Sequence, residues 1–226
     1  MANLGDVWPG LVIFDCDGVL VDSEPIAVRI DIAMLAEVGL TLSEEEVIER
    51  FMGRSPEVIV QTVEEQLGHP PPDSWFERAQ SRLRRAFETE LRPVAGIEEA
   101  LAQIDAPVCV ASSSAPPNLR FKLELTGLYD RFAGHVFSAS EVANGKPAPD
   151  LFLHAAARMG AEPERCVVVE DSRHGVAAAR AAGMDVLAYA GGGMTPAPVL
   201  AGPRTTVFDD MRGLPKLIHA RARDAT

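Results

Sequence analysis

The chain has 226 residues, 47% hydrophobic and 24% charged, which is enough to bury a core as one domain with a modest second one. Its formal net charge of -12 disfavours DNA or RNA as a partner, because neutralising a nucleic-acid backbone requires a basic face. The N-terminus lacks the basic start and apolar stretch of a signal peptide, and no apolar run is long enough to span a membrane.

The three cysteines, Cys16, Cys109 and Cys166, each lie in or just after an apolar run. Their spacing suits neither a zinc site nor a disulfide framework, so we expect buried, reduced thiols. A cytoplasmic setting, without a membrane or nucleic-acid partner, is the default expectation.

The first predicted strand is the apolar run Leu11–Phe14, and a helical interval from about Pro25 to Arg92 follows it almost at once. Within the interval, Ser43 and Glu46 have the spacing of a capping box. The helices predicted there are Ile26–Val38, Ser43–Arg50, Pro56–Gly68 and Trp75–Glu90. We therefore expect a helical domain over residues 21–91, inserted into a second domain formed by residues 1–20 and 92–226.

Beyond the insert, short apolar runs rich in β-branched residues alternate with helical patterns, which predicts a parallel sheet covered by helices. The predicted strands are Val108–Ala111, His135–Phe137, Cys166–Val169, Val186–Tyr189 and Thr206–Phe208. The predicted helices are Gly96–Ile104, Pro117–Leu125, Pro149–Met159 and Ser172–Ala182, the last capped by Gly183. The predicted fold class is α/β, a Rossmann-like parallel sheet sandwiched by helices, with an inserted α-helical domain.

Polar residues gather where the predicted strands end. In open parallel sheets ligands bind at the carboxyl ends of the strands, so these residues are the candidates for a functional site. They are Asp15 and Asp17 after the first strand, Ser112, Ser113 and Ser114 after the second, Glu170 and Asp171 after the fourth, and Lys146 before the helix at Pro149.

The charges of this set indicate a missing cation. Four carboxylates contribute -4, Lys146 contributes +1, and a divalent metal would bring the sum to -1, which one protonated carboxyl would neutralise. Without a metal the cluster would be costly, because buried unpaired carboxylates are strongly disfavoured. Oxygen ligands suit a hard cation, and Mg²⁺ is the leading candidate.

Each motif alone has an ordinary structural explanation. Asp-Gly favours a turn, Ser112–Ser114 or Glu170-Asp171 could cap a helix, and Lys146 could be an exposed loop lysine. These explanations are independent of one another, whereas a functional site needs all four features at strand ends in this order. All four are present, which favours the functional interpretation.

The combined motifs resemble the haloacid dehalogenase superfamily, in the subfamily IA group that contains β-phosphoglucomutase-like proteins and sugar-phosphate or sugar-acid-phosphate phosphatases with a small helical cap. The resemblance is carried by residues 15–24, which read DCDGVLVDSE, by Ser112, by Gly145-Lys146-Pro147 and by Glu170-Asp171-Ser172. It spans nearly the whole chain, and the helical insert lies where this family has its cap.

The resemblance implies a Mg²⁺-dependent phosphatase that hydrolyses a small phosphorylated metabolite through an aspartyl-phosphate. According to this resemblance, Asp15 is the nucleophile, and Asp17 is the general acid and base. The metal ligands would be Asp15, the backbone carbonyl of Asp17, Asp171 and, directly or through water, Glu170. Ser112, the backbone N–H of Ser113 and Lys146 would hold the phosphoryl oxygens, with Ser114 as a weaker contact. Dehalogenases of the superfamily lack a carboxylate at the position of Asp17, so phosphoryl transfer is favoured.

Cap residues are expected to select the substrate, and the candidates are Glu24, Arg29 and Arg54, the last in the segment FMGRSP. Members of the subgroup are often monomers, and a monomer is expected here. One alternative is a sugar-phosphate mutase of the β-phosphoglucomutase type, but the cap histidine of those enzymes is matched by Ala27. Another is a non-catalytic receiver-like phospho-acceptor module, whose aspartate follows the third strand instead of the first.

Overall fold

The computed structural model describes residues 9–51 and 56–224. The chain divides into two compact units. The first, called the core unit below, comprises Met1–Asp22 and Arg92–Thr226, and the second, called the helical unit, comprises Ser23–Leu91.

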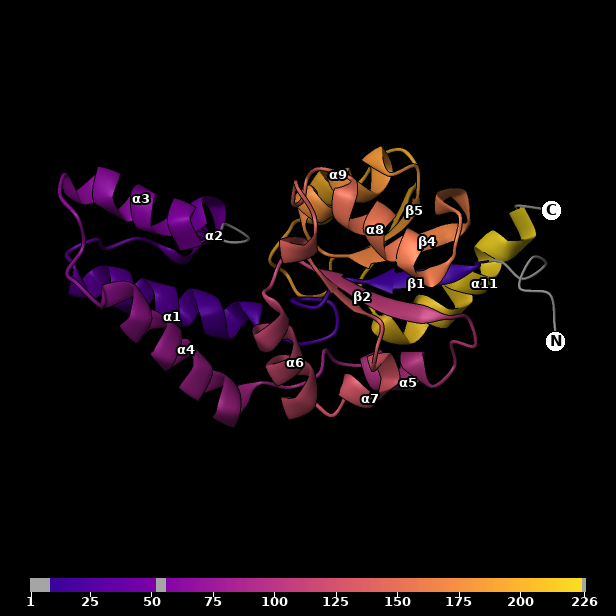
Figure 1. Ribbon diagram of the computed structural model, residues 1–226, viewed down its shortest axis with the longest axis horizontal. Coiled ribbons are helices and arrows are strands. Elements are labelled where there is room, and N and C mark those ends of the chain that lie inside the picture. The colour runs from indigo at the N-terminus through magenta and orange to yellow at the C-terminus, as the bar shows by residue number, and fades with distance from the viewer. Residues whose placement is uncertain (1–8, 52–55, 225–226) are drawn as a thin grey trace. The chain divides into compact units, whose positions relative to one another are not determined.

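The core unit is built on a six-stranded sheet in the order β3-β2-β1-β4-β5-β6, in which all paired strands are parallel (Figure 1). The strands are β1 Leu11–Phe14, β2 Val108–Ser112, β3 Val136–Ser138, β4 Cys166–Glu170, β5 Asp185–Tyr189 and β6 Thr205–Phe208. Each predicted strand forms with ends that differ by at most one residue. The predicted α/β class with a parallel sheet is confirmed.

Both faces of the sheet are covered, which explains why the strands are continuous apolar runs. On one face, Leu11 and Ile13 of β1 belong to an apolar cluster with residues of α8 and α9. These two helices lie above the sheet in Figure 1. On the other face, Phe14 meets Phe132 of α7 edge to face, with ring centroids 5.9 Å apart. The helices of the core unit are α5 Ile97–Leu101, α6 Pro116–Leu125, α7 Tyr129–Phe132, α8 Asp150–Met159, α9 Arg173–Ala181, α10 Ala197–Leu200 and α11 Leu214–Asp224.

Helix α9 ends as predicted. Gly183 adopts φ 74°, its N–H donates to Arg180 O, and the N–H of Met184 donates to Ala179 O. These bonds satisfy the last carbonyls of the helix in the manner of a glycine cap. Three helices were not predicted, namely α7, α10 and α11. The first two have four residues each and show no period, whereas α11 carries a signal in Leu214, Leu217 and Ile218 at helical spacing.

The helical unit consists of α1 Glu24–Glu37, α2 Glu44–Phe51, α3 Pro56–Leu67 and α4 Trp75–Glu90. The expected capping box is present, since Ser43 N donates to Glu46 Oε2 at 2.9 Å and Glu46 N donates to Ser43 Oγ at 3.2 Å. The unit has an apolar core of its own, formed by Val28, Met34, Leu35, Val47, Phe51, Val63, Trp75 and Ala79.

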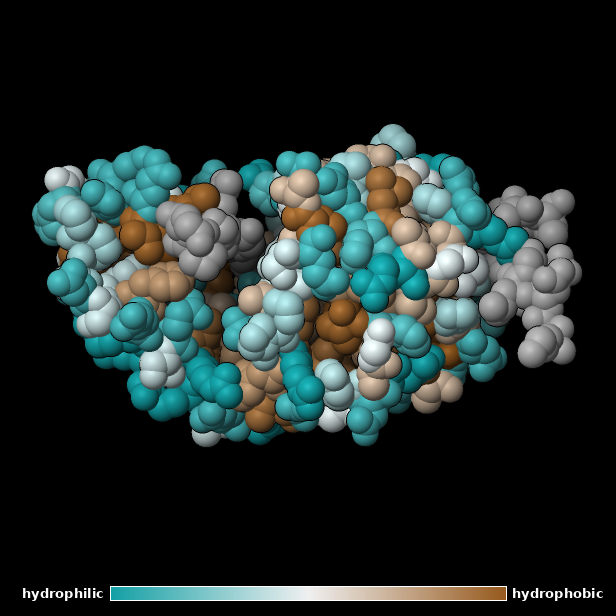
Figure 2. Space-filling view, in the orientation of Figure 1, coloured by the Kyte–Doolittle hydropathy of each residue, from teal (hydrophilic) through white to brown (hydrophobic). Residues whose placement is uncertain are grey.

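The surface of the described residues carries few large apolar side chains. Those exposed are Val58, Leu125, Leu153 and Val199, each on a different helix. Figure 2 shows hydrophilic residues over most of the helical unit at the left of the view. None of the helices in the described part of the chain is long and apolar enough to cross a membrane.

The side chain of Trp75 forms a hydrogen bond with the C-terminal turn of α1. Its indole N–H donates to Met34 O at 2.9 Å, and this carbonyl belongs to the last turn of α1, where no helical partner is available. The side chain is 3% exposed. A bond from α4 therefore satisfies a buried acceptor of α1 and ties the two helices together.

We expect Trp75→Phe to destabilise the helical unit by about 1–3 kcal/mol, because a buried carbonyl loses the indole N–H that donates to it while most of the ring packing is kept. Native-state hydrogen exchange at the amides of α1 and α4 measures this loss locally. Unchanged protection of those amides would contradict the assignment.

Candidate active site

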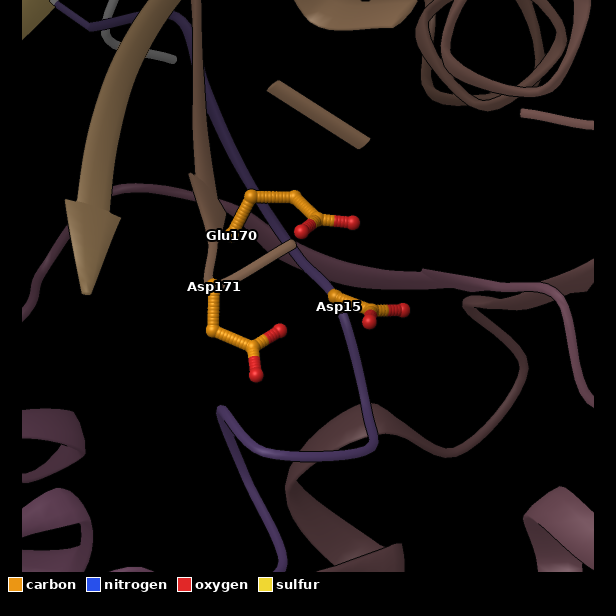
Figure 3. Close-up of side chains that lie close together, drawn as sticks. All are labelled: Asp15, Glu170 and Asp171. Carbon is orange, nitrogen blue, oxygen red and sulfur yellow. The ribbon is translucent and has the colours of Figure 1, made fainter. Parts of the chain in front are cut away.

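Strands β1 and β4 are neighbours at the point where the strand order reverses, because the chain leaves β1 for β2 on one side and β4 lies on the other. Asp15 directly follows β1, and its N–H donates to Val169 O at 3.0 Å. Glu170 is the last residue of β4, and Asp171 follows it. The reversal point is where open α/β sheets bind ligands, and three carboxylates meet there (Figure 3).

The carboxylates of Asp15, Glu170 and Asp171 each offer one oxygen within 4.8 Å of the others. Asp15 is 8% exposed and Glu170 is fully buried. Burial raises the pKa of Asp15 to about 7, with Lys146 opposing the shift and Glu170 and Asp17 adding to it. Removing these charges from water is unfavourable unless cations face them.

Lys146 is the cation that faces two of the three acids. Its Nζ lies 2.7 Å from Glu170 Oε1 and 2.9 Å from Asp15 Oδ1, and its side chain is 5% exposed. The aliphatic part passes over Phe152 of α8, with Nζ 4.9 Å from the ring centroid. Burial by itself lowers the pKa of Lys146, but the charges of Asp15 and Glu170 outweigh it and raise the pKa above its usual range.

Asp15 Oδ1 is buried and lies 2.9 Å from Lys146 Nζ as an ion pair, but within the described part of the chain no group forms a hydrogen bond with it. Three carboxylates and one lysine leave this cluster at -2, which a single divalent cation would neutralise. An oxygen-only donor set, an orphaned buried oxygen and this charge fit a hard divalent metal such as Mg²⁺.

Asp17 is held apart from that cluster. Both of its carboxylate oxygens lie 2.5 Å from Nζ of Lys122 on α6, and Oδ2 also accepts from Ser114 Oγ at 2.9 Å. Burial lowers the pKa of Lys122, but the facing Asp17 outweighs it and raises the pKa to about 12. Between the two acids, Cys16 is fully buried, and burial raises the pKa of its thiol, so it is unreactive.

This pairing corrects the charge count made from the sequence. That count placed four carboxylates against one lysine and needed a protonated carboxyl to reach neutrality. The structure adds Lys122, so a divalent metal alone balances the site. Sequence reasoning missed Lys122, although its position three residues after Leu119 and one before Leu123, both fully buried, indicates the inner face of α6.

The sequence pattern of the haloacid dehalogenase-like hydrolases matches residues 9–183. The chain belongs to the haloacid dehalogenase-like hydrolase family. It is 33% identical over 216 residues to 6-phosphogluconate phosphatase of Escherichia coli strain K12, covering 95% of this chain and 97% of that protein.

Two further matches support the family assignment. Hexitol phosphatase B of Escherichia coli strain K12 is 30% identical over 218 residues, which are 94% of each protein. A solved structure of a conserved haloacid dehalogenase-like protein of unknown function from Agrobacterium tumefaciens strain C58 is 41% identical, with a TM-score of 0.82, covering 94% of this chain and 99% of that one. The chain is thus a hydrolase whose curated relatives include phosphatases.

In this hydrolase the serine segment after β2 is ordered by its own hydrogen bonds. Ser112 is 2% exposed and its Oγ accepts from Ser114 N at 3.1 Å. Ser138 at the end of β3 donates from Oγ to Ser114 O at 2.8 Å. Ser113 is exposed, and Ser114 is the residue that contacts Asp17.

The helical-unit candidates are placed as follows. Glu24 is the first residue of α1, and the guanidinium of Arg29 lies 2.5 Å from Glu90 Oε2, both side chains being about half exposed. Arg54 lies outside the described residues.

The hydrolase joins its two units through two chain segments that are bonded to each other. Asp22 N donates to Arg92 O and Val94 N donates to Leu20 O, both at 3.0 Å. Before this point, Gly18 turns the chain with φ 74° and donates its N–H to Val21 O at 2.9 Å. These bonds define the conformation of the segment that leaves Asp17.

Two glycines, which sequence reasoning missed as site residues, make room for the carboxylates. A Cβ on Gly175 would lie 1.7 Å from Glu170 Oε1, and one on Gly18 would lie 2.1 Å from Asp171 Oδ2. Glu170 Oε2 accepts from Ser172 N at 2.7 Å and from Ser172 Oγ at 3.0 Å, at the start of α9. Glu170 is therefore enclosed by Lys146, Ser172 and the bare backbone of Gly175.

We expect Gly175→Ala to displace Glu170, weaken divalent-metal binding at least about tenfold and lower activity, because a clash of this kind disturbs the oriented metal ligands. Isothermal titration with Mg²⁺ and a phosphatase assay measure both effects. Gly213→Ala is the matched control, since a Cβ there meets nothing within 4 Å. Equal metal affinity in the two variants would contradict the steric assignment.

Proposed function

We propose that this hydrolase is a Mg²⁺-dependent phosphatase of small phosphorylated sugars or sugar acids, working through an aspartyl-phosphate on Asp15. The observation that carries the proposal is the buried Asp15 carboxylate at the strand-order reversal, faced by Lys146 and flanked by Glu170 and Asp171. The similarity to 6-phosphogluconate phosphatase and hexitol phosphatase B supports the substrate class.

In the first step, Asp15 attacks phosphorus and the bond between phosphorus and the ester oxygen breaks, leaving phosphate covalently on Asp15. Asp17 donates a proton to the leaving oxygen. In the second step, Asp17 takes a proton from the water that attacks the same phosphorus, and Asp15 is released with inorganic phosphate. Ser112, the N–H of Ser113 and Lys146 hold the phosphoryl oxygens in both steps.

The residues that would hold Mg²⁺ are Asp15, Asp171, the backbone carbonyl of Asp17 and, directly or through water, Glu170. When bound, the ion supplies positive charge that offsets repulsion between the Asp15 carboxylate and the phosphoryl oxygens. Lys146 contacts Glu170 Oε1 at 2.7 Å and Asp15 Oδ1 at 2.9 Å, which supports a role in orienting both carboxylates.

We expect Asp15→Asn to abolish phosphate release from p-nitrophenyl phosphate and from a sugar-phosphate panel that includes 6-phosphogluconate, a loss of at least about 1,000-fold. Asp105→Asn, at an exposed loop position, is the matched control and should be as active as the wild type. A colorimetric phosphate assay with Mg²⁺ measures the release.

Two outcomes of that panel would reject the phosphatase. Isomerised sugar phosphate without net phosphate release would indicate a mutase. Stable phosphorylation of the protein without turnover would indicate a receiver-like module. Retained activity in Asp15→Asn would remove Asp15 from the role of nucleophile.

Stabilisation by Mg²⁺ should depend on pH. Because the pKa of Asp15 in the metal-free fold is raised from 3.8 to about 7, its contribution to stability is present below about pH 4 and is lost as pH rises through about 7. Mg²⁺ binds the deprotonated form, so the shift in melting temperature that it causes should be larger at pH 8 than at pH 5. Thermal scans with and without Mg²⁺ measure it, and an equal shift at both pH values, or an undiminished pH dependence in Asp15→Asn, would contradict this account.

A further inference from the structure

Lys122 is a buried lysine that the proposed chemistry does not use. It lies on α6, its side chain is 5% exposed, and its Nζ contacts Asp17 Oδ1 and Oδ2 at 2.5 Å and Ser114 Oγ at 3.0 Å. All three polar contacts therefore lead to Asp17 or to the serine that also binds Asp17. Burying an ammonium group is costly unless a charge and hydrogen bonds compensate it, and here Asp17 supplies the charge.

The packing of α6 does not by itself require a lysine at position 122. The neighbours Leu119 and Leu123 are fully buried, so an unbranched apolar side chain of the same length would fit the inner face of the helix. Replacing a buried ion pair by apolar groups is often neutral or stabilising. The reason for Lys122 therefore lies with the carboxylate that it holds.

That carboxylate is held from several elements at once. Lys122 reaches it from α6, and Ser114 donates to its Oδ2 from the segment after β2. Ser114 is in turn fixed by Ser112 Oγ, which accepts from its N–H, and by Ser138 Oγ, which donates to its carbonyl. The Asp17 side chain thus has a defined orientation, whereas Asp15, two residues earlier, is held by a different lysine, Lys146.

We propose that Lys122, with Ser114, is a positioning residue that holds the Asp17 carboxylate away from the Asp15, Glu170 and Asp171 cluster and in the orientation for proton transfer. The proposal rests on the proposed function, in which Asp17 serves the leaving oxygen and then the attacking water. With Lys122 removed, the carboxylate loses the ammonium group that contacts both of its oxygens, and its orientation relative to the neighbouring cluster is less restrained. Proton transfer to the leaving group is then impaired more than attack on phosphorus.

The leaving group provides the test. Nitrophenolate is weakly basic and departs without a proton, whereas phenolate, with a conjugate acid of pKa about 10, needs one. Since kcat/KM reports on steps up to the first irreversible one, we compare kcat/KM for p-nitrophenyl phosphate and phenyl phosphate with Mg²⁺. In Lys122→Met the ratio of the two values should rise at least about tenfold over the wild type, because general acid catalysis contributes roughly 100- to 10,000-fold.

Matched variants make the result specific. Ser114→Ala should raise the same ratio by a smaller factor, and it serves as the second test if Lys122→Met does not fold. Lys216→Met, at an exposed lysine of α11, should leave the ratio unchanged. An unchanged ratio in both Lys122→Met and Ser114→Ala, at whatever absolute rate, would overturn the proposal, since loss of structure alone slows both substrates equally.

Failure of the proposed function has a different signature. Asp17→Asn must raise the ratio at least as much as Lys122→Met does. If Asp17→Asn leaves it unchanged, or if the wild type releases no phosphate from either ester, the proposed role of Asp17 fails and the role of Lys122 fails with it. If Asp17→Asn raises the ratio and the Lys122 and Ser114 variants do not, only the positioning role is wrong.

Discussion

The constraint on which the site depends is mutual repulsion among acids placed at one edge of the sheet. Asp15, Asp17, Glu170 and Asp171 lie at or just after the ends of two adjacent strands, and the side chains of Asp15 and Glu170 are almost or fully buried. Such a cluster is stable only if cations separate its members. The fold provides two lysines, Lys122 on α6 and Lys146 in the segment before α8. Lys122 pairs with Asp17, and Lys146 faces the cluster of the other three acids through Asp15 and Glu170.

This division gives chemically different surroundings to two carboxylates that are only two residues apart. Asp15 belongs to a cluster of three carboxylates faced by Lys146, and its buried Oδ1 fits the metal-ligand and nucleophile roles proposed for it. Asp17 belongs to a neutral, hydrogen-bonded group with Lys122 and Ser114. In this hydrolase the two acids therefore have different partners, which supports the different roles proposed for them.

Two glycines contribute to the site because they carry no side chain. Gly18 and Gly175 leave space that the carboxylates of Asp171 and Glu170 occupy, and a methyl group at either position would overlap those oxygens. Ser172, the N-cap of α9, donates to Glu170 from both its N–H and its hydroxyl, so the helix start also orients a carboxylate. The site thus depends on small residues as much as on charged ones.

The sequence by itself determined the strands to within one residue, the capping box of Ser43 and Glu46, and the presence of acids at the ends of β1 and β4, because these follow from local patterns of burial, capping and chain direction. Together with the motifs, that was enough to identify the family. Only the tertiary structure decided which charge faces which: Lys122 meets Asp17 across 105 residues of chain, and Gly175 meets Glu170 through space. Such contacts depend on how α6 and α9 pack on the sheet, and no local pattern encodes the direction of one side chain relative to another so distant in the chain.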